Sequence, residues 1–116
     1  MSPGENLVEV GEGEFEKEVM ESEFPVIVDF FTPPCAPCKA LVPVLTRAAK
    51  KFPNVKVVKV NAWNNQDLCS RFKIVGVPAL LFFQGGQNVL RLDGFDDSTE
   101  KRIEDGLKDL LENGCE

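Results

Sequence analysis

Two cysteines separated by two residues, Cys35 and Cys38, are the side chains in this sequence whose type and spacing best suit covalent chemistry. They follow an apolar run, 26–31, that is typical of a buried strand, and a helix-like pattern begins at the first cysteine. A helix N-terminus carries partial positive charge and unpaired N–H groups, which stabilise a thiolate and lower its pKa. The second cysteine lies one turn further on the same face, where it can attack a mixed disulfide. We therefore predict that Cys35 is a nucleophile and Cys38 its resolving thiol.

The absence of histidine and the positions of the other two cysteines limit the alternative chemistries. The chain has no histidine, which removes Cys–His and Ser–His catalysis and any histidine-ligated metal site. One Cys-x-x-Cys supplies only two thiolates, so a tetrahedral zinc site would need distant ligands or a second chain. We expect no metal site and no cofactor. Cys69 is predicted to be a small buried hydrophobe. Cys115, in a polar tail, is either inert or able to form an intermolecular disulfide.

Composition sets broad bounds on the kind of protein. The 116 residues suffice for one domain with a hydrophobic core, and we expect a single domain over 1–116 with flexible tails at 1–5 and 112–116. The net charge of −6 argues against a nucleic-acid-binding surface. No apolar run approaches membrane-spanning length, and the first residues lack the pattern of a signal peptide. We expect a cytoplasmic monomer without nucleic-acid or membrane partners.

Hydrophobic periodicity and turn residues predict alternating strands and helices. Strands are expected at 7–10, 26–31, 55–60, 79–83 and 88–92, and helices at 13–22, 35–51, 64–72 and 98–111, the last capped by Ser98. A Gly-Gly hairpin joins the last two strands. This order predicts an α/β fold with a central mixed five-stranded sheet, in which three parallel strands are extended by an antiparallel hairpin and helices cover both faces.

From about Leu7 to Leu111 the chain resembles thioredoxin. The matching motifs, in family order and spacing, are Val28-Asp29-Phe30, Cys35-Ala36-Pro37-Cys38-Lys39, Pro43, Lys59-Val60-Asn61, Val75-Gly76-Val77-Pro78, Gly85-Gly86 and Gly94. A lone Cys-x-x-Cys is a weak signal, whereas this ordered set is a strong one. The resemblance implies the thioredoxin fold and a redox-active disulfide centre.

Asp29 stands in the middle of the apolar strand, six residues before Cys35. The pattern alone allows either an edge aspartate facing water or a buried carboxylate whose pKa is raised by desolvation. The resemblance implies a buried position behind Cys38, where the carboxyl group takes or gives a proton as that thiol reacts. Lys59 occupies the family position that can approach Asp29; the alternative is a solvated lysine at a strand end.

The resemblance also implies a substrate groove beside the cysteines. It implies a cis peptide bond between Val77 and Pro78 that lies against the disulfide, and a backbone at Val77 that pairs with an extended substrate segment. Gly76 and Gly94 are expected to leave this groove free of side chains, so that a substrate backbone can approach closely. The remaining residues expected to contact substrate lie around the cysteine motif: Pro34, Ala36 and Pro37.

This chain departs from the usual family motif, Trp-Cys-Gly-Pro-Cys, because Pro34 replaces the tryptophan and Ala36 the glycine. The lost tryptophan removes a large apolar contact for partners. Phe31 stands at another position often held by tryptophan. Trp63 follows the third strand, and parallel strands bring their carboxyl ends to one edge. We therefore hypothesise that Trp63 packs toward Phe31 and replaces part of the lost surface; the alternative is that it covers the start of the third helix.

The function implied by the resemblance is that of a thiol–disulfide oxidoreductase that reduces disulfide-containing protein substrates. A thioredoxin reductase or another electron donor would then restore the dithiol. The alternative, from a different class, is a thioredoxin-fold protein-binding or assembly module whose redox activity is secondary.

Overall fold

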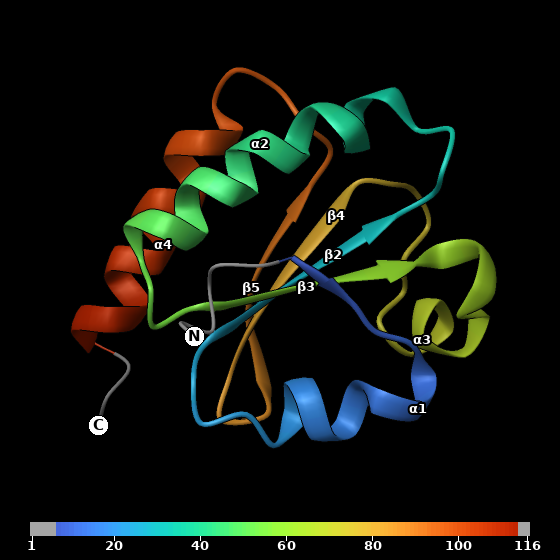
Figure 1. The fold of residues 1–116 in the computed structure, drawn as a ribbon, viewed down its shortest axis with the longest axis horizontal. Helices are drawn as coiled ribbons and strands as arrows, with labels where there is room; N and C mark the ends of the chain where they lie inside the picture. Colours follow the sequence, from blue (N-terminus) through green and yellow to red (C-terminus); the bar gives the residue numbers. More distant parts are fainter. Residues whose placement is uncertain (1–6, 114–116) are drawn as a thin grey trace.

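The computed structural model describes residues 7–113 and contains a five-stranded mixed sheet with helices on both faces (Figure 1). The strands are β1 (Val8–Glu9), β2 (Val26–Phe31), β3 (Lys56–Asn61), β4 (Ala79–Gln84) and β5 (Gln87–Asp93). The helices are α1 (Glu12–Phe15), which continues into the π-helical turn η1 (Glu16–Met20), α2 (Ala36–Lys51), the 3₁₀ turn η2 (Ala62–Asn64), α3 (Gln66–Arg71) and α4 (Thr99–Asn113).

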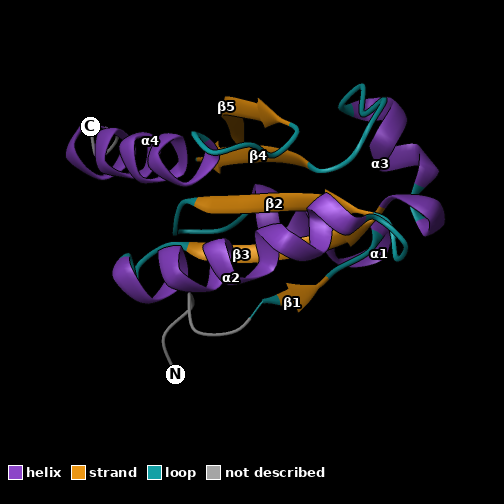
Figure 2. Ribbon diagram, turned by 90° about the horizontal axis from the view of Figure 1, so that it is seen from above, coloured by secondary structure: helices purple, strands orange, loops and turns teal. Residues whose placement is uncertain are grey.

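The strand order across the sheet is β1-β3-β2-β4-β5. β1 and β2 both pair with β3 in parallel, β4 is antiparallel to β2, and β5 is antiparallel to β4 (Figure 2). The expected arrangement of three parallel strands and an antiparallel hairpin is therefore confirmed. The hairpin turns at Gly85 and Gly86, which have φ values of 60° and 79°. This left-handed backbone explains the two glycines.

β2 is the central strand, and its side chains alternate between two cores. Val26, Val28 and Phe30 face the layer of α1, η1 and α3, whereas Ile27 faces the layer of α2 and α4. Because both faces are covered, nearly the whole strand is apolar, as predicted from its sequence. Asp29 is two residues beyond Ile27, so its side chain lies on the α2 face of the sheet.

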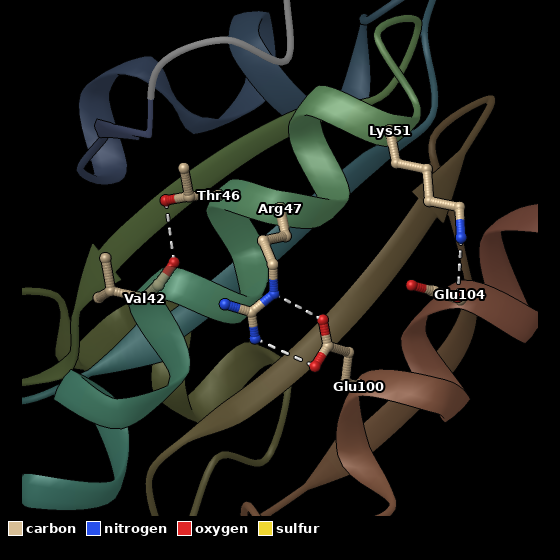
Figure 3. Close-up of polar contacts among 6 residues, drawn as sticks. All are labelled: Val42, Thr46, Arg47, Lys51, Glu100 and Glu104. Carbon is tan, nitrogen blue, oxygen red and sulfur yellow. Dashed lines mark hydrogen bonds and ion pairs between the residues drawn. The ribbon is translucent and has the colours of Figure 1, made fainter.

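α2 runs without interruption through Pro43 and lies beside α4 on the same face (Figures 1 and 3). Leu41 and Leu45 of α2 share a core with Ile103 and Leu107 of α4, and all four are fully buried. Above this core, Arg47 and Lys51 of α2 form ion pairs at 2.8 and 3.2 Å with Glu100 and Glu104 of α4 (Figure 3). These pairs are largely solvent-exposed and contribute little, so the buried leucines and isoleucine hold the two helices together.

The C-terminal helix differs from the expectation at both ends. The hydroxyl of Ser98 donates to the Asp96 carboxylate at 2.7 Å instead of capping the helix. At the other end, Glu112 and Asn113 belong to α4 and not to a tail, because Leu110 and Leu111 pack against the core and extend the helix. The other expected tail residues, including Cys115, lie outside the described residues. Among the helices of residues 7–113, none has the length and apolar character needed to cross a membrane.

The pairing between β4 and β5 carries an irregularity. The β4–β5 register shifts between Phe82 and Phe83, which marks a bulge. The side-chain amide of Asn88 donates to the carbonyl groups of Phe82 and Leu90 at 3.1 and 2.9 Å. At the opposite edge, β1 is only two residues long.

Candidate active site

Cys35 lies where the chain leaves β2 and enters α2. It is the N-cap residue of the helix, with an extended backbone (φ −74°, ψ 109°), and its sulfur accepts the N–H of Cys38 at 3.1 Å. Its own N–H donates to the carbonyl of Thr32 at 3.2 Å, which fixes the loop. Pro37 falls in the first turn, where a missing N–H costs no helical hydrogen bond. A helix N–H therefore points at the Cys35 sulfur, as thiolate stabilisation requires.

Cys38 lies one turn inside the helix and forms a disulfide with Cys35, with their Cα atoms 5.2 Å apart. Cys38 is only 4% exposed, whereas Cys35 is half-buried and accessible from solvent. An incoming disulfide therefore meets the Cys35 sulfur first. The order of attack predicted from the sequence matches these exposures, although the roles themselves stay predictions.

Asp29 is fully buried on β2, and within the described residues neither carboxylate oxygen has a hydrogen-bond partner. Burial raises its pKa from 3.8 to about 7, while the positive charge of Lys59 acts in the opposite direction. The edge alternative, with an aspartate facing water, is excluded. A buried carboxyl group with a pKa near neutrality can exchange a proton at physiological pH.

Lys59 lies opposite Asp29 in the β2–β3 register. No ion pair joins them in residues 7–113; instead the Lys59 ammonium sits 4.4 Å from the centroid of the Phe31 ring. Lys59, Phe31 and Cys38 line a pocket of about 160 Å³ together with Pro33. Lys59 is therefore close enough to affect the Asp29 charge, and it shares a solvent-facing pocket with the buried cysteine.

The predicted cis bond between Val77 and Pro78 is present, directly ahead of β4. The carbonyl of Pro78 accepts the N–H of Gly94 at 2.8 Å, which ties this loop to the end of β5. Gly94 has φ 80°, a conformation that favours glycine. A Cβ added at Gly76 or Gly94 would meet no atom within 4 Å, so a side chain at either position would project into open space. Neither glycine therefore adds a side chain to the surface beside the loop, and their role in substrate binding stays a prediction.

The loop after β2, the loop before β4 and the end of β3 all lie at one end of the sheet (Figure 1). Because the parallel strands β2 and β3 finish here, this end is the carboxyl edge of the sheet, as distinct from the edge strands β1 and β5. Pro34, Ala36 and Pro37 are exposed at this edge and available to a partner. Thr32 was missed by the sequence reasoning, yet it accepts the Cys35 N–H and lines pockets on both sides of the loop. Its only signal in the sequence is its position between the strand and the cysteines.

Trp63 lies at this edge, as expected, but not beside Phe31. It is 59% exposed and lines a second pocket, of about 260 Å³, with Thr32, Gly76 and Val77. Phe31 lines the other pocket, on the α2 side of the sheet. The two aromatic residues therefore face different layers, and the proposed packing of Trp63 toward Phe31 is not observed.

Residues 7–113 contain no cluster of three or more cysteine, aspartate or glutamate side chains placed to hold a metal ion. The chemistry available at this edge is that of the cysteine pair and the buried carboxyl group. A disulfide-forming pair at a helix N-terminus, beside a cis-proline loop on a mixed sheet, defines a dithiol–disulfide centre.

Comparison with known proteins agrees with this description. The sequence model of the thioredoxin family matches residues 6–109. Thioredoxin 1 from Nostoc sp. is 40% identical over 82 residues, covering 70% of this chain and 77% of that protein. Thioredoxin 1 from Synechococcus elongatus is 42% identical over 81 residues, covering 69% of this chain and 76% of that protein. The structure of a mutant thioredoxin from Halobacterium salinarum superposes with a TM-score of 0.81 at 30% identity, covering 93% of this chain and 92% of that one.

The chain belongs to the thioredoxin family. Its similarity to thioredoxins at about 40% identity, together with the Cys35–Cys38 disulfide, supports its assignment as a thiol–disulfide oxidoreductase.

Proposed function

We propose that this protein is a cytoplasmic, monomeric, single-domain reductant of disulfide bonds in other proteins. The observation that carries the proposal is the asymmetry of the cysteine pair: an accessible sulfur at a helix N-terminus and a buried sulfur one turn behind it. The first sulfur suits attack on an external disulfide, and the second suits an internal attack that releases the product.

In the proposed reaction the Cys35 thiolate attacks one sulfur of the substrate disulfide. The substrate S–S bond breaks, its other sulfur leaves as a thiolate that takes a proton from water, and a mixed disulfide forms. Cys38 then loses its proton and attacks the Cys35 sulfur, which releases the second substrate thiolate and closes the Cys35–Cys38 disulfide. Two electrons pass from the protein dithiol to the substrate, whose two cysteines end as thiols.

Asp29 is proposed to accept the proton of Cys38 during this second attack. Its pKa of about 7 allows the carboxylate to be present and basic near neutral pH. The Lys59 charge, which opposes the burial effect on Asp29, is proposed to keep that pKa from rising further. Both side chains lie on the α2 side of the sheet, and Lys59 lines the same pocket as Cys38.

The reduced dithiol must be restored by an electron donor. A bifunctional thioredoxin reductase/thioredoxin from Mycobacterium leprae is 38% identical over 88 residues, which cover 75% of this chain and 19% of that protein. That relative supports the proposal that a thioredoxin reductase is the electron donor here. The reductase would contact this chain at the exposed residues Pro34, Ala36 and Pro37.

Reduction of insulin by dithiothreitol, followed by turbidity, tests the proposal. The wild-type protein should accelerate the reaction, whereas Cys35→Ser and Cys38→Ser should leave it near the uncatalysed rate. Cys115→Ser, which removes a thiol outside the Cys-x-x-Cys motif, is the matched control and should retain acceleration. Acceleration by Cys35→Ser equal to that of the wild type would exclude the reductase role and favour a binding module.

A further inference from the structure

The pocket that contains Trp63 has the character of a binding site for an uncharged group. It holds about 260 Å³, and none of the residues that line it is charged. Trp63 and Val75 form its rim and are 59% and 97% exposed. Large apolar side chains exposed together beside a reactive centre usually mark a contact surface.

The rim is held in place by buried and partly buried hydrogen bonds. The side-chain oxygen of Asn61 accepts the backbone N–H of Trp63 at 2.9 Å, and the amide of Asn65 donates to the Asn61 carbonyl at 2.8 Å. Both asparagines are less than 10% exposed. Gln66 also donates to the carbonyl of Ala62 at 2.7 Å. The turn that presents the indole is therefore fixed before any partner arrives, which lowers the entropic cost of binding.

The floor of the pocket includes Cys69, which is 9% exposed. Its thiol lies 3.6 Å from the carbonyl oxygen of Ala62. Burial, with a smaller effect of Glu12, raises the pKa of the Cys69 thiol, so the floor is neutral at physiological pH. A charged group entering this pocket would lose water without gaining a partner of opposite charge.

The pocket is continuous with the candidate active site. Thr32 lines it, and the carbonyl of the same residue accepts the N–H of Cys35. Val77, the residue before the cis-proline, lines it as well. A chain that extends along the edge at Val77 while one of its cysteines meets Cys35 therefore passes over the pocket.

On the basis of the proposed reduction of protein disulfides, we propose that this pocket receives an apolar side chain, such as leucine, methionine or phenylalanine, that lies close in sequence to the attacked cysteine. Trp63 is the specificity-determining residue. The volume of 260 Å³ is below the roughly 300 Å³ at which small-molecule sites begin, which favours one side chain over a free ligand. In an extended segment, side chains two positions apart face the same way. The favoured residue is therefore two positions from the attacked cysteine.

Matched disulfide peptides test the proposal. Each peptide lacks tryptophan and carries leucine, alanine, aspartate or lysine two positions before or after the cysteine. For one of these two positions, wild-type kcat/KM should be at least about tenfold higher with leucine than with alanine, as a filled apolar pocket provides, and lowest with aspartate or lysine. Trp63→Ala should remove most of this preference, and Trp63→Phe should retain part of it.

Phe24→Ala is the matched control, because Phe24 is a 41% exposed aromatic residue ahead of β2, at the end of that strand remote from the cysteines. It should leave the preference unchanged. Equal rates for the four peptides, a preference that survives Trp63→Ala, or an equal loss in Phe24→Ala would each overturn the pocket assignment. Insulin reduction separates the two proposals: if the wild type reduces insulin but shows no peptide preference, only the pocket assignment fails. If insulin is reduced as well by Cys35→Ser, the reductase role fails and the pocket assignment with it.

Discussion

Replacing Asp29 by asparagine should change how the stability of this protein depends on pH. The carboxyl group is fully buried without a hydrogen bond in the described residues, and its pKa is about 7 in the folded state against an ordinary value of 3.8. Between these two pH values the unfolded chain has lost the proton and the folded chain still holds it. Folding then requires proton uptake, so the free energy of unfolding falls as the pH rises through this window.

The magnitude follows from the two pKa values. One pH unit is worth about 1.4 kcal/mol for a single proton, so a window from 3.8 to about 7 amounts to about 4 kcal/mol. This penalty is absent below pH 3.8, grows between the two values and is complete above pH 7. Asparagine cannot ionise. The free energy of unfolding of Asp29→Asn minus that of the wild type should therefore increase by about 4 kcal/mol between pH 4 and pH 8.

Urea denaturation of the oxidised proteins at several pH values measures this difference, with the single tryptophan, Trp63, as the fluorescent probe. Any cost of burying the asparagine amide is the same at every pH and cancels in the comparison. Asp97→Asn, which removes an exposed carboxylate in the loop before α4, is the control for the loss of one negative charge. A flat difference for Asp29→Asn would refute the assignment of a neutral buried carboxyl group and remove Asp29 as proton acceptor.

Three further outcomes are expected. Alkylation of the reduced protein near neutral pH should label Cys35 before Cys38, as mass spectrometry of the peptides would report; earlier labelling of Cys38 would reverse their roles. Lys59→Met should raise the pKa of Asp29 further, because the lysine charge now lowers it, and the pH at which the stability penalty of Asp29 is complete should move upward in the same denaturation series. An unmoved transition would mean that Lys59 does not act on this carboxyl group. Leu41→Ala, on the buried face of α2, should lower the free energy of unfolding measured in urea by about 2–5 kcal/mol. A loss below about 1 kcal/mol would contradict the packing described for α2 and α4.

Much of the fold could be predicted from the sequence because its signals are local. The apolar run of β2 and the glycine pair of the hairpin each specify an element through short-range physics. The end of α4 could not be predicted so well. Its last turn depends on Leu110 and Leu111 meeting residues far away in the chain.

The candidate site divides in the same way. Cys35 and Cys38 could be found from spacing alone, whereas the burial of Asp29 needed the family resemblance to choose between two alternatives. The pocket of Trp63 could not be predicted, because the layer that a residue faces after a strand end depends on the turn that follows. Here the turn η2 directs Trp63 to the α3 side, while Phe31 faces α2.

The edges of the sheet have a consequence for aggregation. A protein that meets partly unfolded partners encounters chain segments that seek free strand edges to pair with. In this chain the edge strand β1 offers only two residues, and the bulge in the β4–β5 pair bends the other edge strand, β5. Strand addition along the flanks of the sheet is thus discouraged. Extended clients are left with the loop at Val77, beside the reactive sulfur, as the place to add their backbone.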